Sequence, residues 1–531
     1  MPVFQQQTNG ERDRLSATIH LLGDILGRVI REQAGANAFA LEERVRGLAK
    51  DLRANNHPYQ VEAMQRIVAG LTVGQARDLL KSFSTYFALV NLSEQLQRIW
   101  VLRDRALERP GEPRAESIAA AVAELKRNQI APDAIQRWLD SALILPVFTA
   151  HPTEARRRTT LQKLRRIADA VERVNAALPP DEAEEAERQI AEEIVGLWQS
   201  DEVRVIRPTV VDEVKNGLYY FEATLVDLIP RLYRDLEREL RRHYPEHEWR
   251  VPPLLRFGSW MGGDRDGNPY VTPEVTIETV RLMRAWALRR HIGAVEALSH
   301  RLGQSTRQVA VGDDLARSLD ADAALFPQVA ELLAHRNPFE PYRQKCTYIR
   351  EKLLRSIEHT DAHAPDWGHR EPLPLAGSFY AGRDDLLADL RVIECSLRAN
   401  AGDSVADGAL HDLIRQVEVF GLHVATLDIR QHSERHTAAL AEVLRLTGVC
   451  DDYVALDEPA RVALLAREVA NPRPLIPARL AYTLETIETV RLMRAWALRR
   501  HIGAVEALSH RLGQSTRQVA VGDDLARSLD A

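Results

Sequence analysis

Apolar residues recur every three or four positions along most of the 531-residue chain, which is the spacing of an amphipathic helix. One such stripe runs through Leu15, Ile19, Leu22, Leu26 and Val29, and a second through Leu288, Ile292, Val295, Leu298 and Leu302. Residues 179–192 predict an acidic surface helix that follows a Pro-Pro turn, and residues 109–115 and 363–374 predict loops. The pattern therefore predicts a mostly helical protein with these stripes in its core.

Three short segments depart from helical spacing and predict buried strands: residues 143–149, 254–260 and 419–429. The segments are separated by long helical stretches, which favours a parallel α/β arrangement with large helical insertions. In parallel barrels the functional residues lie where strands end at their carboxyl edge. Polar clusters follow all three segments, so we expect a site there.

An exact repeat occupies the end of the sequence. Residues 276–321 recur without one substitution as residues 486–531, at an offset of 210. Repeats in solenoid proteins are short, contiguous and diverged, and this one is none of these. We interpret it as a recent duplication, a chimeric junction or an assembly error. We expect the second copy to add no function and to be artefactual or loosely ordered.

Composition narrows the class of protein. The apolar fraction of 45% and the charged fraction of 27% are ordinary for a soluble protein, and the net charge is −6 without a basic block. The N-terminus is polar, no run reaches the roughly 18 apolar residues of a membrane span, and the three cysteines have no paired spacing. We expect a cytoplasmic protein with no nucleic-acid and no membrane partner.

The first polar cluster is TAHPTEARRR, residues 149–158. Pro152 disfavours the helical region for His151 and suits the first turn of a following helix, with Glu154 in that turn. His151 would then lie at a strand-to-helix elbow beside backbone N–H groups and the arginines at 156–158, which can hold an anion. The histidine is a candidate general base. A histidine that merely caps the helix remains the alternative.

The second cluster is GSWMGGDRDGNP, residues 258–269. Its glycines permit positive φ and close backbone approach, as a loop that lines a site needs. A calcium loop is excluded because Pro269 replaces the required glycine and no acid stands at the twelfth position. A P-loop is excluded because no Gly-Lys-Ser/Thr follows. A glycine-rich site loop and a structural turn both remain open.

The third cluster is LDIRQHSERH, residues 427–436. Arg430 lies at the predicted end of the strand and could bind an anionic substrate. His432 and His436 are four residues apart and could bind a metal on a helix, but Ser433 stands where the zincin pattern needs glutamate. A solvated helix start is the better account of the two histidines.

Together these clusters resemble the phosphoenolpyruvate carboxylase family. Residues 197–222, the stretch LLGDILGRVIREQAG and FGLHVATLDIRQHSERH add to the match, which runs from about residue 15 to about residue 485. Thr426 departs from it, since many members have Arg or Lys there. The resemblance implies a mostly α-helical protein with a TIM-type α/β barrel. Residues 1–485 would hold only about the first half of that barrel, with large helical insertions.

The resemblance also implies a reaction. Family members condense phosphoenolpyruvate with bicarbonate to give oxaloacetate and phosphate, use Mg²⁺ or Mn²⁺, and form homotetramers. His151 matches the histidine that takes the carboxyphosphate proton, and Arg430 an arginine that binds phosphoenolpyruvate. Trp260 matches a tryptophan near the carbon-dioxide pocket, and Arg265 an arginine of the same loop.

One family motif is absent from this sequence. The later GYSDSxKDxG motif, with a metal-binding aspartate and a catalytic lysine, does not occur, and none of the seven lysines has that context. We therefore assign no metal ligand within the chain. The expected function is phosphoenolpyruvate carboxylase. The alternative is a catalytically inactive fragment of that enzyme that acts at most as a binding or assembly protein.

Overall fold

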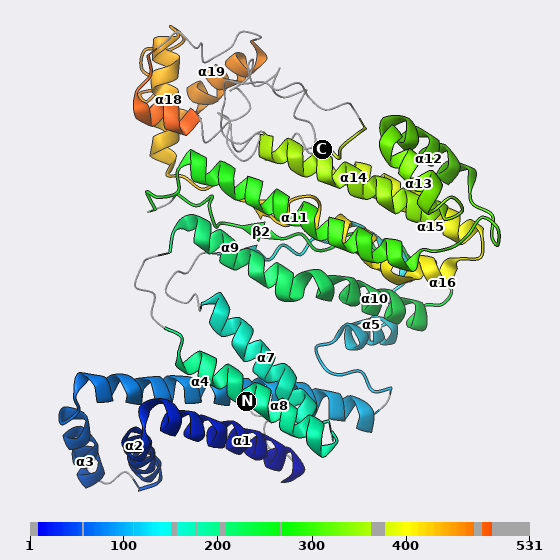
Figure 1. Cartoon of the computed structure of the whole chain (residues 1–531). Coiled ribbons are helices and arrows are strands. Elements are labelled where there is room, and N and C mark those ends of the chain that lie inside the picture. Colours follow the sequence, from blue (N-terminus) through cyan, green and yellow to red (C-terminus); the bar gives the residue numbers. More distant parts are fainter. Residues whose placement is uncertain are drawn as a thin grey trace. The chain divides into compact units, whose positions relative to one another are not determined.

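The computed structural model describes residues 9–55, 58–109, 111–149, 157–176, 178–201, 208–265, 268–362, 377–471 and 481–490. The chain divides into two compact units (Figure 1). Unit 1 comprises Met1–Ala115 and Thr153–Arg207, and unit 2 comprises Glu116–Pro152 and Pro208–Ala531. Each unit is described by itself.

Unit 1 is a helical bundle. Its helices are α1 (Asn9–Ala34), α2 (Ala36–Asn55), α3 (Pro58–Ala69), α4 (Val73–Glu108), α7 (Arg158–Val174) and α8 (Pro180–Trp198). The predicted stripe on α1 is confirmed, since Leu22, Leu26 and Val29 are buried in the core that α1 shares with α4, α7 and α8. The acidic helix at 179–192 is also confirmed as α8. It is amphipathic, because Ile190 and Ile194 are fully buried against α7.

Unit 2 is also mostly helical. Its larger elements are α5 (Ile118–Arg127), α6 (Pro132–Ser141), α9 (Val210–Tyr220), α10 (Val226–His243), α11 (Pro273–Arg301), α12 (Asp313–Leu325), α13 (Pro327–Arg336), α14 (Pro341–Ala362), α15 (Arg383–Ala399), α17 (His411–Phe420), α18 (Ser433–Leu446) and α19 (Glu458–Ala470). Short helical segments occupy Phe221–Leu225, Asp403–Val405 and Ala406–Leu410. The second predicted stripe is confirmed on α11, which buries Leu288, Val295 and Leu298 in a core shared with α14 and α15. Within the described part of the chain, every helix is too short or too polar to span a bilayer.

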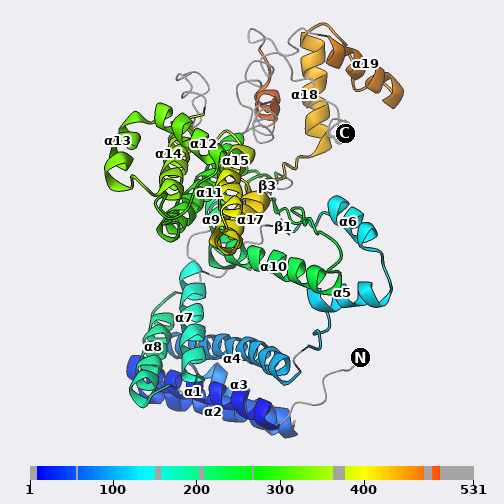
Figure 2. The same cartoon turned by 90° about the vertical axis from the view of Figure 1, so that its right-hand side faces the viewer.

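The three predicted strand segments form one parallel sheet. Its strands are β1 (Val147–Phe148), β2 (Gly258–Ser259) and β3 (Thr426–Leu427), with β2 in the middle. The two outer strands, β1 and β3, are labelled in Figure 2. Each strand is much shorter than its predicted segment. Residues 419–420 are not strand but the end of α17, which stops at Gly421 with a φ of +55°. The continuous apolar run there did not distinguish a buried helix end from a strand.

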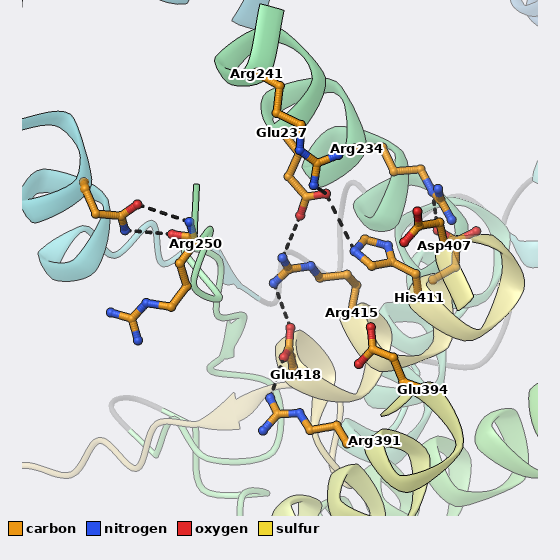
Figure 3. A network of polar contacts seen from close by, with 12 residues as sticks. Arg234, Glu237, Arg241, Arg250, Arg391, Glu394, Asp407, His411, Arg415 and Glu418 are labelled. Atoms are coloured by element: carbon orange, nitrogen blue, oxygen red, sulfur yellow. Dashed lines mark hydrogen bonds and ion pairs between the residues drawn. The ribbon is translucent and has the colours of Figure 1, made fainter. Parts of the chain in front are cut away.

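Aromatic packing and an ion-pair network fix the approach to the sheet. The rings of Phe257, next to β2, and Phe420, at the end of α17, stack with centroids 5.5 Å apart. Arg415 of α17 contacts Glu237 of α10 at 2.6 Å and Glu418 at 2.8 Å (Figure 3). These contacts hold α17 against α10, five residues before β3 begins.

A second polar cluster is buried among α12, α14 and α15. The Lys345 ammonium, which is fully buried, lies 2.7 Å from Asp322 and 2.5 Å from Asp389. Lys352 contacts the same two carboxylates at 2.6 and 3.0 Å. Two cations and two anions therefore balance one another, as buried charges require.

Candidate functional site

The structure brings Trp260, Arg265 and Arg430 together at the carboxyl ends of β2 and β3. The Trp260 N–H donates to the Phe148 carbonyl of β1 at 2.8 Å, and the Arg265 N–H donates to the Arg430 carbonyl at 2.9 Å. The guanidinium carbon of Arg430 lies 4.3 Å from the Trp260 ring centroid, which is a cation–π contact. The expectation that these clusters meet at one sheet edge is therefore confirmed for the second and third clusters.

Asp264 joins this group, and sequence reasoning did not select it. Its Oδ2 accepts a hydrogen bond from Arg430 Nη1 at 3.1 Å, and the two residues also pair as an isolated parallel bridge. The Arg430 side chain remains 43% exposed and that of Asp264 27%. Asp264 therefore orients the arginine while leaving it accessible to solvent. No local spacing indicated this role, because the two residues are 166 positions apart.

Two glycines let the loop after β2 approach the loop after β3. Gly262 adopts a φ of +83°, which L-residues rarely adopt. A Cβ on Gly263 would lie 2.2 Å from the Asp428 carbonyl oxygen, so only glycine fits against that backbone. The sequence expectation of positive φ and close approach is confirmed at these positions.

Arg265 is half-buried among charges of both signs. Burial is the largest effect and lowers the pKa of Arg265, and Arg435 lowers it as well, whereas Glu488 and Glu274 raise it. A phosphate or carboxylate bound to this guanidinium would offset the cost of burying its charge. With Arg430, the edge presents cations suited to an anionic substrate.

His151 lies outside the described residues, as do Pro152, Glu154 and Arg156. β1 ends at Phe148, and Arg157 is the N-cap of α7, which begins at Arg158. The predicted elbow therefore lies between two described elements. The role predicted for His151 remains a prediction. The helix start predicted at Pro152 is not that of α7, which begins at Arg158 after an extended Arg157.

The histidine pair of the third cluster lies at a helix start. His432 is the exposed N-cap of α18, and His436 follows in its first turn, where burial lowers the pKa of the imidazole. Among the described residues, no group of three or more His, Cys, Asp or Glu side chains is arranged to hold a metal ion. We therefore assign no metal ligand among the described residues.

A pocket of about 630 Å³ lies beside α18, but it is not formed by the three site residues. Arg435 and Arg445 line it, together with five carboxylates: Glu434, Glu442, Asp451, Asp452 and Glu485. Excess negative charge opposes the binding of an anion. We therefore assign the candidate site to the sheet edge and not to this pocket.

Comparison with known proteins decides the family. The family model described as phosphoenolpyruvate carboxylase matches residues 15–530. The chain belongs to the phosphoenolpyruvate carboxylase family. A phosphoenolpyruvate carboxylase of Roseiflexus castenholzii is 60% identical over 488 residues, which cover 92% of this chain and 52% of that protein. One of Rhodothermus marinus is 39% identical over 490 residues, covering 90% and 50%.

The resemblance inferred from the sequence clusters is thereby confirmed. A phosphoenolpyruvate carboxylase of Azorhizobium caulinodans, 35% identical over 509 residues, gives the same coverage, with 93% of this chain and 52% of the relative. The chain therefore spans about half the length of the phosphoenolpyruvate carboxylases that it matches.

Proposed function

We propose that this chain contributes the phosphoenolpyruvate-binding part of a phosphoenolpyruvate carboxylase, which forms oxaloacetate and phosphate from phosphoenolpyruvate and bicarbonate. The observation that carries the proposal is the meeting of Arg430, Arg265 and Trp260 at one sheet edge. Guanidinium groups bind phosphate and carboxylate through charge-assisted hydrogen bonds. Family membership supports phosphoenolpyruvate as this anion.

The proposal gives each residue a role. Arg430 binds the substrate anion, and Asp264 holds its guanidinium in place. Arg265 adds positive charge beside it, and Trp260 forms an apolar wall where carbon dioxide can be held away from water. His151 accepts the proton of carboxyphosphate, so that carbon dioxide is released toward the enolate that attacks it. The Mg²⁺ or Mn²⁺ of the family stays part of the proposal without assigned ligands.

We also propose a place for the sheet in a larger fold. β1 and β3 are the outer strands of the three described, and parallel sheets are normally covered on both faces and continued or closed. The relatives are about twice as long, so further strands can complete a TIM-type barrel. A homotetramer and a cytoplasmic location belong to the same proposal.

We also propose that the two copies of the repeat differ in function. The first copy, residues 276–321, serves the site, since its helix α11 packs against the loop after β2. The second copy, residues 486–531, serves no site. Hydrogen exchange of fragments that include each copy's unique flank tests this, and equal strong protection across both copies would argue for a real duplicated module.

Binding and turnover test the function separately. We expect the 531-residue polypeptide to bind phosphoenolpyruvate in a calorimetric titration without turnover, because the family's later lysine motif is absent. Residues 1–485 fused to the C-terminal half of the Roseiflexus castenholzii relative should produce oxaloacetate, measured by coupling to malate dehydrogenase. His151→Asn in the fusion should lose turnover far more than binding.

Two outcomes would contradict the proposal. If neither the polypeptide nor the fusion binds phosphoenolpyruvate, the anion site is assigned wrongly. If the polypeptide binds and the fusion binds without turnover, the alternative function, a binding or assembly protein, is supported instead.

A further inference from the structure

A buried hydroxyl holds the turn that carries Trp260 and Arg265. Thr276, in the first turn of α11, is fully buried, and its Oγ1 donates a hydrogen bond to the Gly262 carbonyl at 2.8 Å. α11 is itself anchored at this end, since the Thr272 side chain caps it and Pro273 opens it. The carbonyl is thus tied to a rigid element.

The peptide that carries this carbonyl is bonded at both of its polar groups. Gly262 and Gly263 are consecutive, and while the Gly262 carbonyl accepts from Thr276, the N–H of Gly263 donates to the Trp260 carbonyl at 3.0 Å. Gly262 has a φ of +83°, which glycine adopts without strain. While Thr276 holds the Gly262 carbonyl toward α11, the Gly263 carbonyl accepts from the Arg430 N–H at 3.0 Å. The Arg430 carbonyl in turn accepts from the Arg265 N–H at 2.9 Å. The Thr276 hydroxyl is therefore linked, through the two glycines, to the backbone hydrogen bonds of Arg430 and Arg265.

The geometry points to Thr276 as a positioning residue that sets the loop after β2 in register with Arg430. Without the hydroxyl, the Gly262 carbonyl is buried without its donor, which favours rotation of the Gly262–Gly263 peptide toward another donor. That rotation breaks the hydrogen bond from the Gly263 N–H to the Trp260 carbonyl and so loosens the glycine whose own carbonyl accepts from Arg430. Trp260 and Asp264, which flank the two glycines, then lose their alignment on the Arg430 guanidinium.

The repeat offers a matched control. Thr486 has the same sequence following it as Thr276 and is also buried, but it lines the pocket beside α18 together with Glu442. Thr276→Val and Thr486→Val therefore remove the same group ahead of the same downstream sequence. The residues that precede the two threonines differ, so Thr486→Val is a control for the loss of a buried hydroxyl away from the loop after β2.

Two measurements on the 531-residue chain test the inference. In Thr276→Val, the amides of Arg265 and Arg430 should exchange about tenfold faster, while amides in the core of α15 stay protected. Thr276→Ser should restore slow exchange, and Thr486→Val should match the wild type. The ligand-binding part rests on the proposed function: the dissociation constant for phosphoenolpyruvate should rise about tenfold in Thr276→Val only.

The outcomes separate the two ideas. If the wild type binds no phosphoenolpyruvate, the proposed function fails, and amide exchange still decides the role of Thr276. If exchange accelerates equally throughout unit 2, the hydroxyl has a merely structural role and the inference is overturned. It is also overturned if the wild type binds phosphoenolpyruvate and Thr276→Val binds it equally well with unchanged exchange.

Discussion

Replacing Arg430 by alanine should separate ligand binding from stability. The Arg430–Asp264 pair is partly exposed, so its contribution to the free energy of unfolding is about 0.2–1 kcal/mol. The stacking on Trp260 contributes about 0.5–1 kcal/mol more. Arg430→Ala should therefore cost at most about 2 kcal/mol of stability.

The effect on binding should be much larger in proportion. A hydrogen bond to a charged group contributes about 1.5–3 kcal/mol, which raises the dissociation constant for phosphoenolpyruvate about 10- to 100-fold. Isothermal titration calorimetry at fixed ionic strength measures this constant, and thermal unfolding measures the stability. Arg430→Lys keeps the charge without the planar fork, so its constant should fall between those of the wild type and Arg430→Ala.

Arg391 provides the matched control. It is an exposed arginine of α15, in the same unit, that contacts Glu418 of α17 at 3.0 Å (Figure 3). Arg391→Ala should lose a similar small amount of stability and bind phosphoenolpyruvate as the wild type does. The assignment of the anion site would be refuted if Arg391→Ala and Arg430→Ala weakened phosphoenolpyruvate binding equally. It would also be refuted if Arg430→Ala bound phosphoenolpyruvate as tightly as the wild type.

Further predictions concern the loop, the core and pH. Gly263→Ala should destabilise unit 2 by about 1–3 kcal/mol in urea unfolding and weaken phosphoenolpyruvate binding, because its Cβ meets the Asp428 carbonyl oxygen; an unchanged midpoint would contradict the close approach. Lys345→Met should lower the free energy of unfolding by about 3–5 kcal/mol in the same assay, because it leaves Asp322 and Asp389 with one cation fewer. A loss below about 1 kcal/mol would contradict the role of this cluster in stability. Burial raises the pKa of Glu42 to about 7, so the folded state binds its proton more tightly and stability falls as pH rises from about 4.5 to about 7. Glu42→Gln should flatten the stability–pH curve in this range. An unaltered slope of stability against pH would contradict the raised pKa of Glu42.

Periodicity predicted the helices well and the strands in part. The stripes on α1 and α11 were found because each helix buries one face, and that burial leaves a regular spacing in the sequence. The strand segments were found because they interrupt that spacing. Their ends were not, since the pairing of β3 with β2 depends on residues far away in the sequence.

The residues of the candidate site could also be predicted only in part. Trp260, Arg265 and Arg430 could be placed at one edge because parallel strands end on the same side. Asp264 and Thr276 could not, because their roles depend on which backbone groups and side chains lie opposite them across the loop. The buried pairing of Lys345 with two aspartates left no signal either, because charged residues at helical spacing ordinarily predict an exposed face.

The sheet has a consequence for the order of folding. Val147 pairs with Gly258, and Gly258 pairs with Thr426, so the two pairings close loops of 111 and 168 residues. The helix pair α7–α8, in contrast, forms within about 40 neighbouring residues. Long closures are entropically costly and come after local contacts. The anion site should therefore be among the last regions to form, and substitutions that slow the docking of α17 should delay ligand binding long after helical structure has appeared.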